Sequence, residues 1–432
     1  MHLGSRSLVF ALCLPLGLAA CADDGGSGPP PPGQEVRSDK PYDPTPDVSA
    51  EDQAALVAGA TDFALRLHHQ LAAEPGNLVY SPLSMSTALG MLYVGARGDT
   101  ESQMAHALGY TLPQERLHPA MSWLALQLAS RADVDPGEGG GQPFALRVVN
   151  HVWAQTGYAF LPAFLDTLSV SYDAGLSLLD FAKDAPAARI AINDWVAAQT
   201  NDRIKDLLPE GKPDADSKLV LTNAVYFTAS WMNAFEDSAT HDAPFHPLEG
   251  AAVSVPTMFK TDDDGAYAAG DGYVLAEMPY VGGQVAMTLL VPDAGRFDEI
   301  EAGLTGAGLD AMLAELHPSA LAISMPRFQV ELGLSLPETL AALGMTDAFN
   351  SKADFSGIDG APGLYVQAVL HKAFIKVDEE GTEAAAATAV VVGDTAAPLG
   401  ETVTVDRPFL FFLRDRGTGA ILFVGRVTNP AQ

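Results

Sequence analysis

The stretch from residue 376 to 408 constrains the fold most, because it is flanked like a loop and composed like a buried strand. Its ends are rich in charged and turn-forming residues, including Gly381. Between 382 and 392 it holds only small and β-branched residues, apart from Glu383. If this part forms a strand, alternate side chains share one face. That face is uncharged and consists of Thr382, Ala384, Ala386, Thr388, Val390 and Val392. The stretch could therefore lie in an exposed loop or in the middle of a sheet.

Two motifs at the start of this stretch suggest a family. His371-Lys372-Ala373 precedes it, and Val377-Asp378-Glu379-Glu380-Gly381-Thr382-Glu383 opens it. Together they resemble the hinge of the serpins, a family of mostly protease-inhibiting proteins whose reactive loop inserts into a β-sheet after cleavage. The alternative is a flexible, alanine-rich linker near the C-terminus. The resemblance implies a reactive-centre loop at about 381–400, with a hinge made of Glu380, Gly381, Thr382, Glu383, Ala384, Ala385 and Ala386.

Further motifs extend the resemblance over residues 52–432, in the order expected for a serpin. They include a helical pattern that begins at Leu56, the run 77–84, the strand-like run 221–227 and an apolar hairpin between 408 and 424. The resemblance implies an α+β serpin fold: a large, central, mostly antiparallel β-sheet, further sheets, about nine helices and an exposed reactive loop. A monomer is expected.

The resemblance also implies a polar cluster beneath the opening of the central sheet. In serpins, the residues that match Asn223 and His371 form a hydrogen-bonded shutter, which must part when the loop enters. Ser81 and Ser84 match small hydroxyl residues at the same place. The alternatives are a satisfied core asparagine at position 223 and a helix cap at Ser81-Pro82.

The N-terminus has the pattern of an exported lipoprotein. An apolar run, Leu8 to Leu18, follows Arg6 and is too short to span a bilayer. It ends in Leu18-Ala19-Ala20-Cys21, which resembles a bacterial lipobox with Cys21 as the lipidated residue. An ordinary signal peptide with an incidental cysteine is the alternative. We therefore predict a lipoprotein signal peptide at 1–20 and a chain anchored to the cell envelope, at the outer membrane or cell surface, or released outside the cell.

Composition divides the rest of the chain into a tether and one domain. Residues 21–51 are rich in Gly, Pro, Ser and Asp, so they are predicted to form an extended tether. Residues 52–432 contain no second linker and no internal repeat, and a single serpin domain is predicted there. The only cysteines are Cys13 and Cys21, so the mature domain is expected to hold no disulfide.

Charge and missing motifs exclude several functions. The formal net charge is −30, from 24 basic and 54 acidic residues, which disfavours nucleic acid and anionic polysaccharides as partners. No basic cluster suggests a heparin site. No hydrolase, metalloprotease or nucleotide-binding motif occurs, so no catalytic residue, metal or cofactor is expected. The run Asp262–Gly265 lacks the later ligands of an EF-hand and is predicted to be an exposed turn, and His68-His69 to lie on a solvated helix face.

Counting from the hinge glycine places the scissile bond of a serpin at Thr395-Ala396, uncertain by one or two residues. A small residue there suits an elastase-like or subtilisin-like serine protease, whereas a cut after Asp394 would suit an Asp-specific one. Insertion of the loop is expected to release on the order of 10 kcal/mol, enough to trap the acyl-enzyme. The uncharged face favours an inhibitor that acts as a suicide substrate. The alternatives are a non-inhibitory serpin that serves as a surface binding protein, and a hydrolase, which no motif supports.

Overall fold

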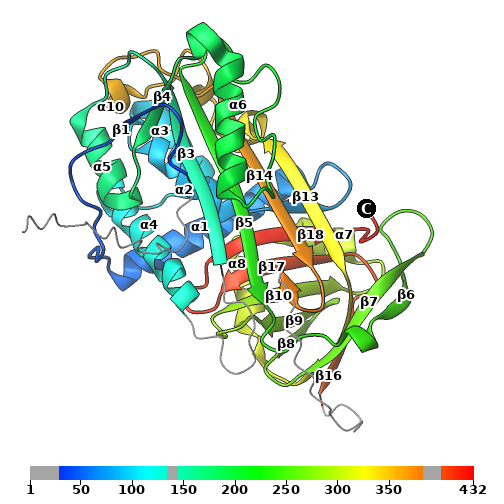
Figure 1. Cartoon of the computed structure of the whole chain (residues 1–432). Coiled ribbons are helices and arrows are strands. Elements are labelled where there is room, and N and C mark those ends of the chain that lie inside the picture. Colours follow the sequence, from blue (N-terminus) through cyan, green and yellow to red (C-terminus); the bar gives the residue numbers. More distant parts are fainter. Residues whose placement is uncertain (1–28, 134–144, 383–399) are drawn as a thin grey trace, which may run out of the picture.

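The computed structural model describes residues 29–133, 145–382 and 400–432. This part of the chain forms ten α-helices and three β-sheets, an α+β architecture as predicted (Figure 1). The helices are α1 (Ala50–Leu71), α2 (Pro82–Tyr93), α3 (Gly98–Leu108), α4 (Gln114–Ala129), α5 (Pro162–Tyr172), α6 (Phe181–Gln199), α7 (Phe297–Gly303), α8 (Gly306–Ala314), α9 (Pro337–Ala342) and α10 (Ser356–Asp359). Within these described residues, none of the helices combines the length and the apolar character that a bilayer span requires.

The central sheet has seven strands in the order β1-β4-β3-β5-β15-β14-β13. Their bounds are β1 (Gln34–Val36), β4 (Leu176–Leu179), β3 (Ala145–Gln155), β5 (Leu219–Ser230), β15 (Gly381–Thr382), β14 (Ala368–Val377) and β13 (Phe328–Ser335). All neighbouring pairs are antiparallel except β3–β4 and a direct pairing of β5 with β14. The mostly antiparallel central sheet is therefore confirmed.

Alternate side chains of β5 pack into two separate parts of the core. Val220 and Ala224 belong to an apolar cluster with α6, which includes Trp195. Leu221 and Val225 point to the opposite face, into the main core. Both faces of the strand are therefore covered, as its continuous apolar sequence predicts.

A second sheet has the order β11-β8-β9-β10-β17-β18-β2, and a third has the order β16-β12-β7-β6. The second consists of β11 (His317–Pro318), β8 (Ala266–Gly270), β9 (Tyr273–Pro279), β10 (Val285–Pro292), β17 (Phe409–Asp415), β18 (Ile421–Val427) and β2 (Leu78–Tyr80). The third consists of β16 (Glu401–Thr404), β12 (Leu321–Pro326), β7 (Val253–Asp262) and β6 (His241–Phe245). The predicted C-terminal hairpin is the antiparallel pair β17–β18.

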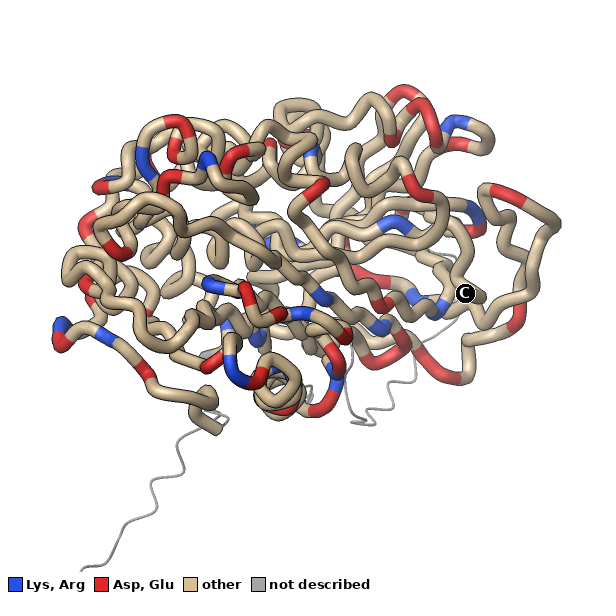
Figure 2. The backbone as a smooth tube through the Cα atoms, turned by 90° about the horizontal axis from the view of Figure 1, so that it is seen from above, with Lys and Arg blue, Asp and Glu red and all other residues tan. Residues whose placement is uncertain are grey.

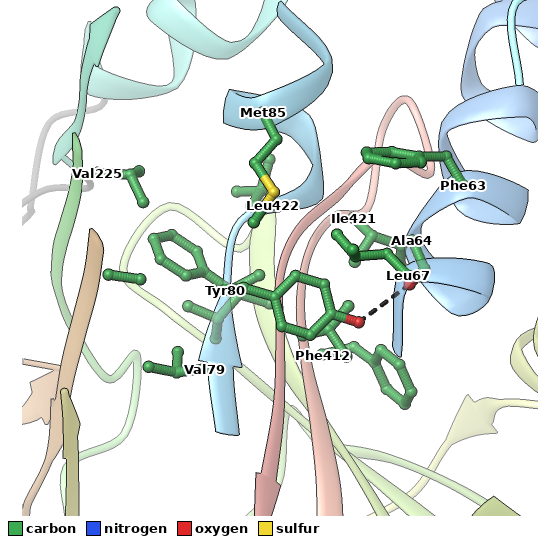
Figure 3. Close-up of a cluster of buried hydrophobic side chains, with 14 of the residues drawn as sticks. Phe63, Ala64, Leu67, Val79, Tyr80, Met85, Val225, Phe412, Ile421 and Leu422 are labelled. Atoms are coloured by element: carbon green, nitrogen blue, oxygen red, sulfur yellow. Dashed lines mark hydrogen bonds between the residues drawn. The ribbon is translucent and has the colours of Figure 1, made fainter. Parts of the chain in front are cut away.

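Strand β2 brings the start of α2 against the core between α1 and the second sheet (Figure 3). Tyr80 is fully buried there, and its hydroxyl donates to the Ala64 carbonyl at 3.0 Å. Ser81 then caps α2, since its side chain accepts the amide of Ser84 and Pro82 follows at the first helical position. The chain is therefore fixed both before and after Ser81, and these contacts position Ser81 under the central sheet.

The structure corrects the prediction of an extended tether for residues 29–51, the part of the segment 21–51 that it describes. Gln34–Val36 is strand β1 at the edge of the central sheet, paired with β4. The Pro29 carbonyl accepts the indole N–H of Trp195 at 2.9 Å, and Lys40 pairs with Asp166 at 2.8 Å. The segment has few apolar side chains, but its backbone forms hydrogen bonds with the edge of the sheet, and these bonds let it dock. Composition alone did not indicate this pairing.

Two smaller predictions were wrong in part, because a buried partner offsets the cost of burying a polar group. His68 is only 1% exposed, with its Nε2 at 2.8 Å from a Glu301 oxygen, instead of on a solvated face. In the run Asp262–Gly265, Asp263 and Asp264 form an exposed turn, but Asp262 does not belong to it. Asp262, expected in an exposed turn, is fully buried and pairs with Lys260 at 2.7 Å.

Charged residues are distributed along the whole described chain, with acidic and basic positions interspersed (Figure 2). The excess of acidic residues is therefore a property of the general surface. Within residues 29–133, 145–382 and 400–432, no group of three or more His, Cys, Asp or Glu side chains is arranged to hold a metal ion.

Candidate functional site

The boundary between β5 and β14, here called the seam, is closed along most of its length. The two strands pair directly and in parallel, from Ala368 opposite Val220 to Phe374 opposite Tyr226. At one end, the two residues of β15 enter between them. Gly381 of β15 lies opposite Ser230 of β5, and Thr382 of β15 lies opposite Val377 of β14. The predicted hinge thus begins inside the sheet, at the mouth of the seam.

A tight turn at residues 378–381, here called the hinge turn, sends the chain from β14 back into the seam. The amide of Asp378 donates to the Gly381 carbonyl at 3.0 Å, and its side chain accepts the amide of Glu380 at 3.2 Å. Gly381 has φ +155°, and a Cβ at this position would lie 2.1 Å from the carbonyl oxygen of Ala229. Only glycine therefore lets the chain pass this close to β5.

Thr382 is the last described residue before the loop, and it is fully buried. Its hydroxyl lies 2.7 Å from the hydroxyl of Tyr280. The ring of Tyr280 stacks on Trp231 at 4.5 Å between centroids, and burial raises the pKa of its hydroxyl. The first inserted side chain of the loop is therefore fully enclosed and hydrogen-bonded through its hydroxyl.

The segment from Trp231 to Phe235, here called the support turn, holds the hinge turn from outside. The Trp231 amide donates to the Glu380 carbonyl at 2.9 Å, and its indole N–H donates to the Asp378 carbonyl at 3.0 Å. The Phe235 amide donates to the Glu379 carbonyl at 2.9 Å. Three consecutive carbonyl groups of the hinge turn are thus satisfied by one short segment.

Glu379 is a buried carboxylate next to the hinge. Burial raises its pKa, but bonds from Arg327 and Thr240 outweigh that effect, so the pKa of Glu379 lies below its usual value. The Arg327 Nε donates to Glu379 at 2.7 Å, and the Thr240 hydroxyl also donates to it. This ion pair ties the hinge turn to the start of β13, beside a cleft of about 530 Å³ that includes Asp237 and Pro430.

The predicted shutter residues lie together under the seam. His371 and Asn223 face each other in the β5–β14 register, and both are buried. The Nδ1 of His371 hydrogen-bonds to the Asn223 side-chain oxygen, and its Nε2 accepts the Ser81 amide at 3.3 Å. Accepting at Nε2 requires the neutral ring, and burial lowers the pKa of His371 to about 3. A neutral imidazole therefore bridges the seam to the cap of α2.

Asn223 also bonds to α2 and to the neighbouring strand β3. Its side-chain NH₂ donates to the Ser84 hydroxyl and to the side-chain oxygen of Asn150 on β3. Asn150 in turn donates to the Ser84 carbonyl at 3.2 Å. One connected network therefore joins β14, β5, β3 and α2. Asn150 was not assigned to this cluster from the sequence, although its place opposite Asn223 in a neighbouring strand carries the signal.

Several predicted site residues lie outside the described part of the chain. These are the lipidation residue Cys21, the hinge residues Glu383, Ala384, Ala385 and Ala386, and the reactive-bond residues Thr395 and Ala396. The chain is described again from Gly400, and β16 pairs in parallel with β12 directly after it. The loop is thus bounded by the seam at one end and by the third sheet at the other.

These features define a mixed-sheet protein with a loop that enters its central sheet, and the family comparison agrees. The family model described as serpin (serine protease inhibitor) matches residues 58–430, so the chain belongs to the serpin family. It is 37% identical over 388 residues to the leukocyte elastase inhibitor of Bos taurus, covering 87% of this chain and 99% of that protein. It is 36% identical over 389 residues to an uncharacterized serpin-like protein of Thermococcus kodakarensis, with 89% and 88% covered.

Solved structures support the same assignment. The native state of the thermophilic serpin tengpin superposes with a TM-score of 0.79 at 28% identity, covering 91% of this chain and 97% of that one. Uncleaved ovalbumin gives a TM-score of 0.76 at 26% identity, with 87% and 100% covered. The serpin fold is therefore established, and family membership supports a role in protease inhibition in general.

Proposed function

We propose that this chain inhibits a serine-type protease as a suicide substrate. The nucleophile of the protease attacks the scissile carbonyl of the loop, the peptide bond breaks, and its amine leaves as a new N-terminus while an ester joins the two proteins. The freed loop then enters the seam before water hydrolyses the ester. The observation that carries this proposal is β15, since two loop residues already occupy the mouth of an otherwise closed seam.

The exchange of strand pairs gives insertion its driving force. Entry of the loop would break the single parallel ladder between β5 and β14, which has seven residue pairs from Ala368 to Phe374. It would replace this ladder with two antiparallel ladders that continue those of β15. Each additional backbone hydrogen bond contributes on the order of 1 kcal/mol net. The uncharged alternate residues from Thr382 to Val392 allow this burial without a desolvated charge.

We infer that the reactive bond is Thr395-Ala396 and that the target is an elastase-like or subtilisin-like protease. Small residues on both sides of this bond fit a small, apolar specificity pocket. The similarity to proteins named leukocyte elastase inhibitor supports this class of target.

Incubation with elastase-like and subtilisin-like enzymes tests the proposal. We expect an adduct that survives SDS, with mass spectrometry placing the cut after Thr395. Clean cleavage of the loop with no adduct would contradict inhibition and favour a non-inhibitory binding protein. Turnover of a peptide substrate without any added protease would favour an enzyme.

A charge introduced at the mouth of the seam should block trapping without blocking cleavage. Thr382→Arg places a guanidinium at a fully buried position beside Tyr280, so insertion should stall and the ester should be hydrolysed. We expect this variant to be cut at the same bond with little or no adduct. Thr156→Arg, the same substitution at an exposed position after β3, is the matched control and should trap normally.

We further propose that the chain is exported and held to the cell envelope by lipid on Cys21. Because the domain is docked from Pro29 onward, only residues 21–28 separate it from the lipid, a reach of roughly 30 Å at most. Cys21→Ser should move the protein from the membrane fraction to the soluble fraction. An unchanged membrane fraction would contradict lipid anchoring.

A further inference from the structure

A buried lysine lies beneath the support turn, and neither the sequence pattern nor the shutter network involves it. Lys260 on β7 is only 5% exposed. Its Nζ lies 2.7 Å from a carboxylate oxygen of Asp262 and donates to the Asn233 carbonyl, also at 2.7 Å. The same ammonium stands 5.1 Å from the ring centroid of Trp231 and 4.7 Å from that of Phe235.

A buried ammonium is retained only where its partners replace water. Burial lowers the pKa of Lys260, and the charge of Asp262 opposes that effect. Apart from Asp262, the partners of the ammonium belong to the support turn: one backbone carbonyl and two aromatic faces. Asn233 closes the arrangement, since its side-chain amide donates to Asp262 at 2.8 Å. The charge therefore fixes the conformation of the turn from inside.

The support turn has two distinct surfaces. Its backbone N–H groups at Trp231 and Phe235 face the hinge turn and bind the carbonyls of residues 379 and 380. Its rings and the Asn233 carbonyl face Lys260, and the ring of Trp231 contacts both sides because its indole N–H donates to the Asp378 carbonyl of the hinge turn. A substitution at Lys260 should therefore shift the Trp231 and Phe235 amides that donate to the hinge turn.

Lys260 is also in register with the strand that follows the loop. It lies opposite Ile323 on β12, and Ile323 lies opposite Val403 on β16. The chain enters β16 at Glu401, directly after the loop. Lys260 thus contacts the support turn at the N-terminal end of the loop and belongs to the third sheet, which the chain joins at the C-terminal end of the loop.

We propose that Lys260 is a positioning residue for the hinge: it holds the support turn in the conformation that keeps the hinge turn folded at the mouth of the seam. It touches neither the loop nor a protease. Its effect on inhibition rests on the function proposed above, whereas its effect on the support turn does not. Without the ammonium, the turn loosens, insertion begins later, and more of the acyl-enzyme is hydrolysed before trapping.

Amide hydrogen exchange tests the positioning role directly. In Lys260→Met, the amides of Trp231 and Phe235 should exchange about tenfold faster or more than in the unaltered protein. Because this change leaves Asp262 buried without its cation, the double variant Lys260→Met/Asp262→Asn is measured beside it. Lys260→Arg keeps the charge and should restore much of the protection.

The control removes a comparable buried cation elsewhere. Arg414→Met deletes one of the two arginine partners of Glu277 in the second sheet, a pair joined at 2.6 Å whose carboxylate side chain is 2% exposed, and Arg416 remains at 3.1 Å. It should leave the exchange of the Trp231 and Phe235 amides unchanged. Equal acceleration in the control would reveal general destabilisation and overturn a specific role for Lys260.

The second readout is the number of inhibitor molecules consumed per protease trapped. We expect this number to rise several-fold in both lysine-to-methionine variants and to return toward the original value in Lys260→Arg. Unchanged exchange of the two amides in a folded variant would overturn the proposal whatever the inhibition data. If the unaltered protein traps no protease, the proposed function fails, while the exchange result still decides the role of Lys260.

Discussion

At the scale of single residues, Asn223 has the most connected position in the site, since its amide joins His371 to Ser84 and Asn150. Asn223→Ala would leave several buried polar groups without a partner. We expect the native form to lose about 2–4 kcal/mol of unfolding free energy, because each such orphaned group costs about 1–3 kcal/mol. Urea unfolding of the uncleaved protein measures this loss.

The control for this measurement is Asn350→Ala. Asn350 is exposed and bonds only within its own turn, to Thr346 and Lys352. It should lose roughly 1 kcal/mol or less. If the two variants lost the same free energy, the network under the seam would contribute no special stability.

The sequence analysis predicted four residues of this network, Ser81, Ser84, Asn223 and His371, but it missed Asn150. Asn223 stands out because a polar side chain in an apolar strand needs partners. The resemblance to serpins indicated His371, Ser81 and Ser84. Asn150 escaped because its role depends on the β3–β5 register, which is a long-range feature. His68 was misplaced because a histidine beside another histidine on a helix gives no sign of Glu301, which is 233 residues away.

At the scale of secondary-structure elements, the two-residue strand β15 depends on Gly381. In Gly381→Ala, the added methyl group would collide with the Ala229 carbonyl, 2.1 Å away, so β15 should leave the mouth of the seam. We expect the amide of Thr382 to exchange faster. In protease assays, we expect a larger fraction of the inhibitor to be cleaved without trapping the protease. Retained protection at Thr382 would contradict the close approach of these backbones.

Pattern reasoning succeeded for the long elements and failed for the short ones. The apolar runs that form β5, β17 and β18 carry enough side-chain information to be recognised. Strand β1 has three residues and a sequence rich in polar groups, so only its backbone bonds to β4 define it. The same applies to β15, whose existence depends on a gap between two strands far apart in the sequence.

At the scale of the whole molecule, three histidines with lowered pKa values predict how stability depends on pH. Burial lowers the pKa of His371 to about 3 and the pKa values of His118 and His151 to about 4, against 6.5 for an exposed histidine. The unfolded chain therefore binds more protons below pH 6.5. Stability should be complete above that pH and fall below it by up to about 1.4 kcal/mol per pH unit for each ring.

Unfolding by urea between pH 6.5 and 5 measures this dependence before most carboxylates titrate. His118→Gln should remove about a third of the slope that the three histidines contribute. A slope that His118→Gln leaves unchanged would show that other groups dominate acid sensitivity.

The described residues confirm the family and fold that the sequence motifs indicated, with ten helices where about nine were expected. Several of these motifs lie at the seam of the central sheet or in the hydrogen-bonded network beneath it. The reactive bond was predicted by counting residues from the hinge glycine, and no contact within the fold determines its position. Its assignment to Thr395-Ala396 therefore depends on a protease assay.

The thermal unfolding midpoint, compared before and after a single cut in the loop, tests most directly whether the uncut fold stores energy. If the freed loop fills the seam, a gain on the order of 10 kcal/mol should raise the midpoint by roughly 10–20 °C. An unchanged midpoint after complete cleavage would show that the loop stays outside the central sheet, and trapping by insertion would have to be abandoned.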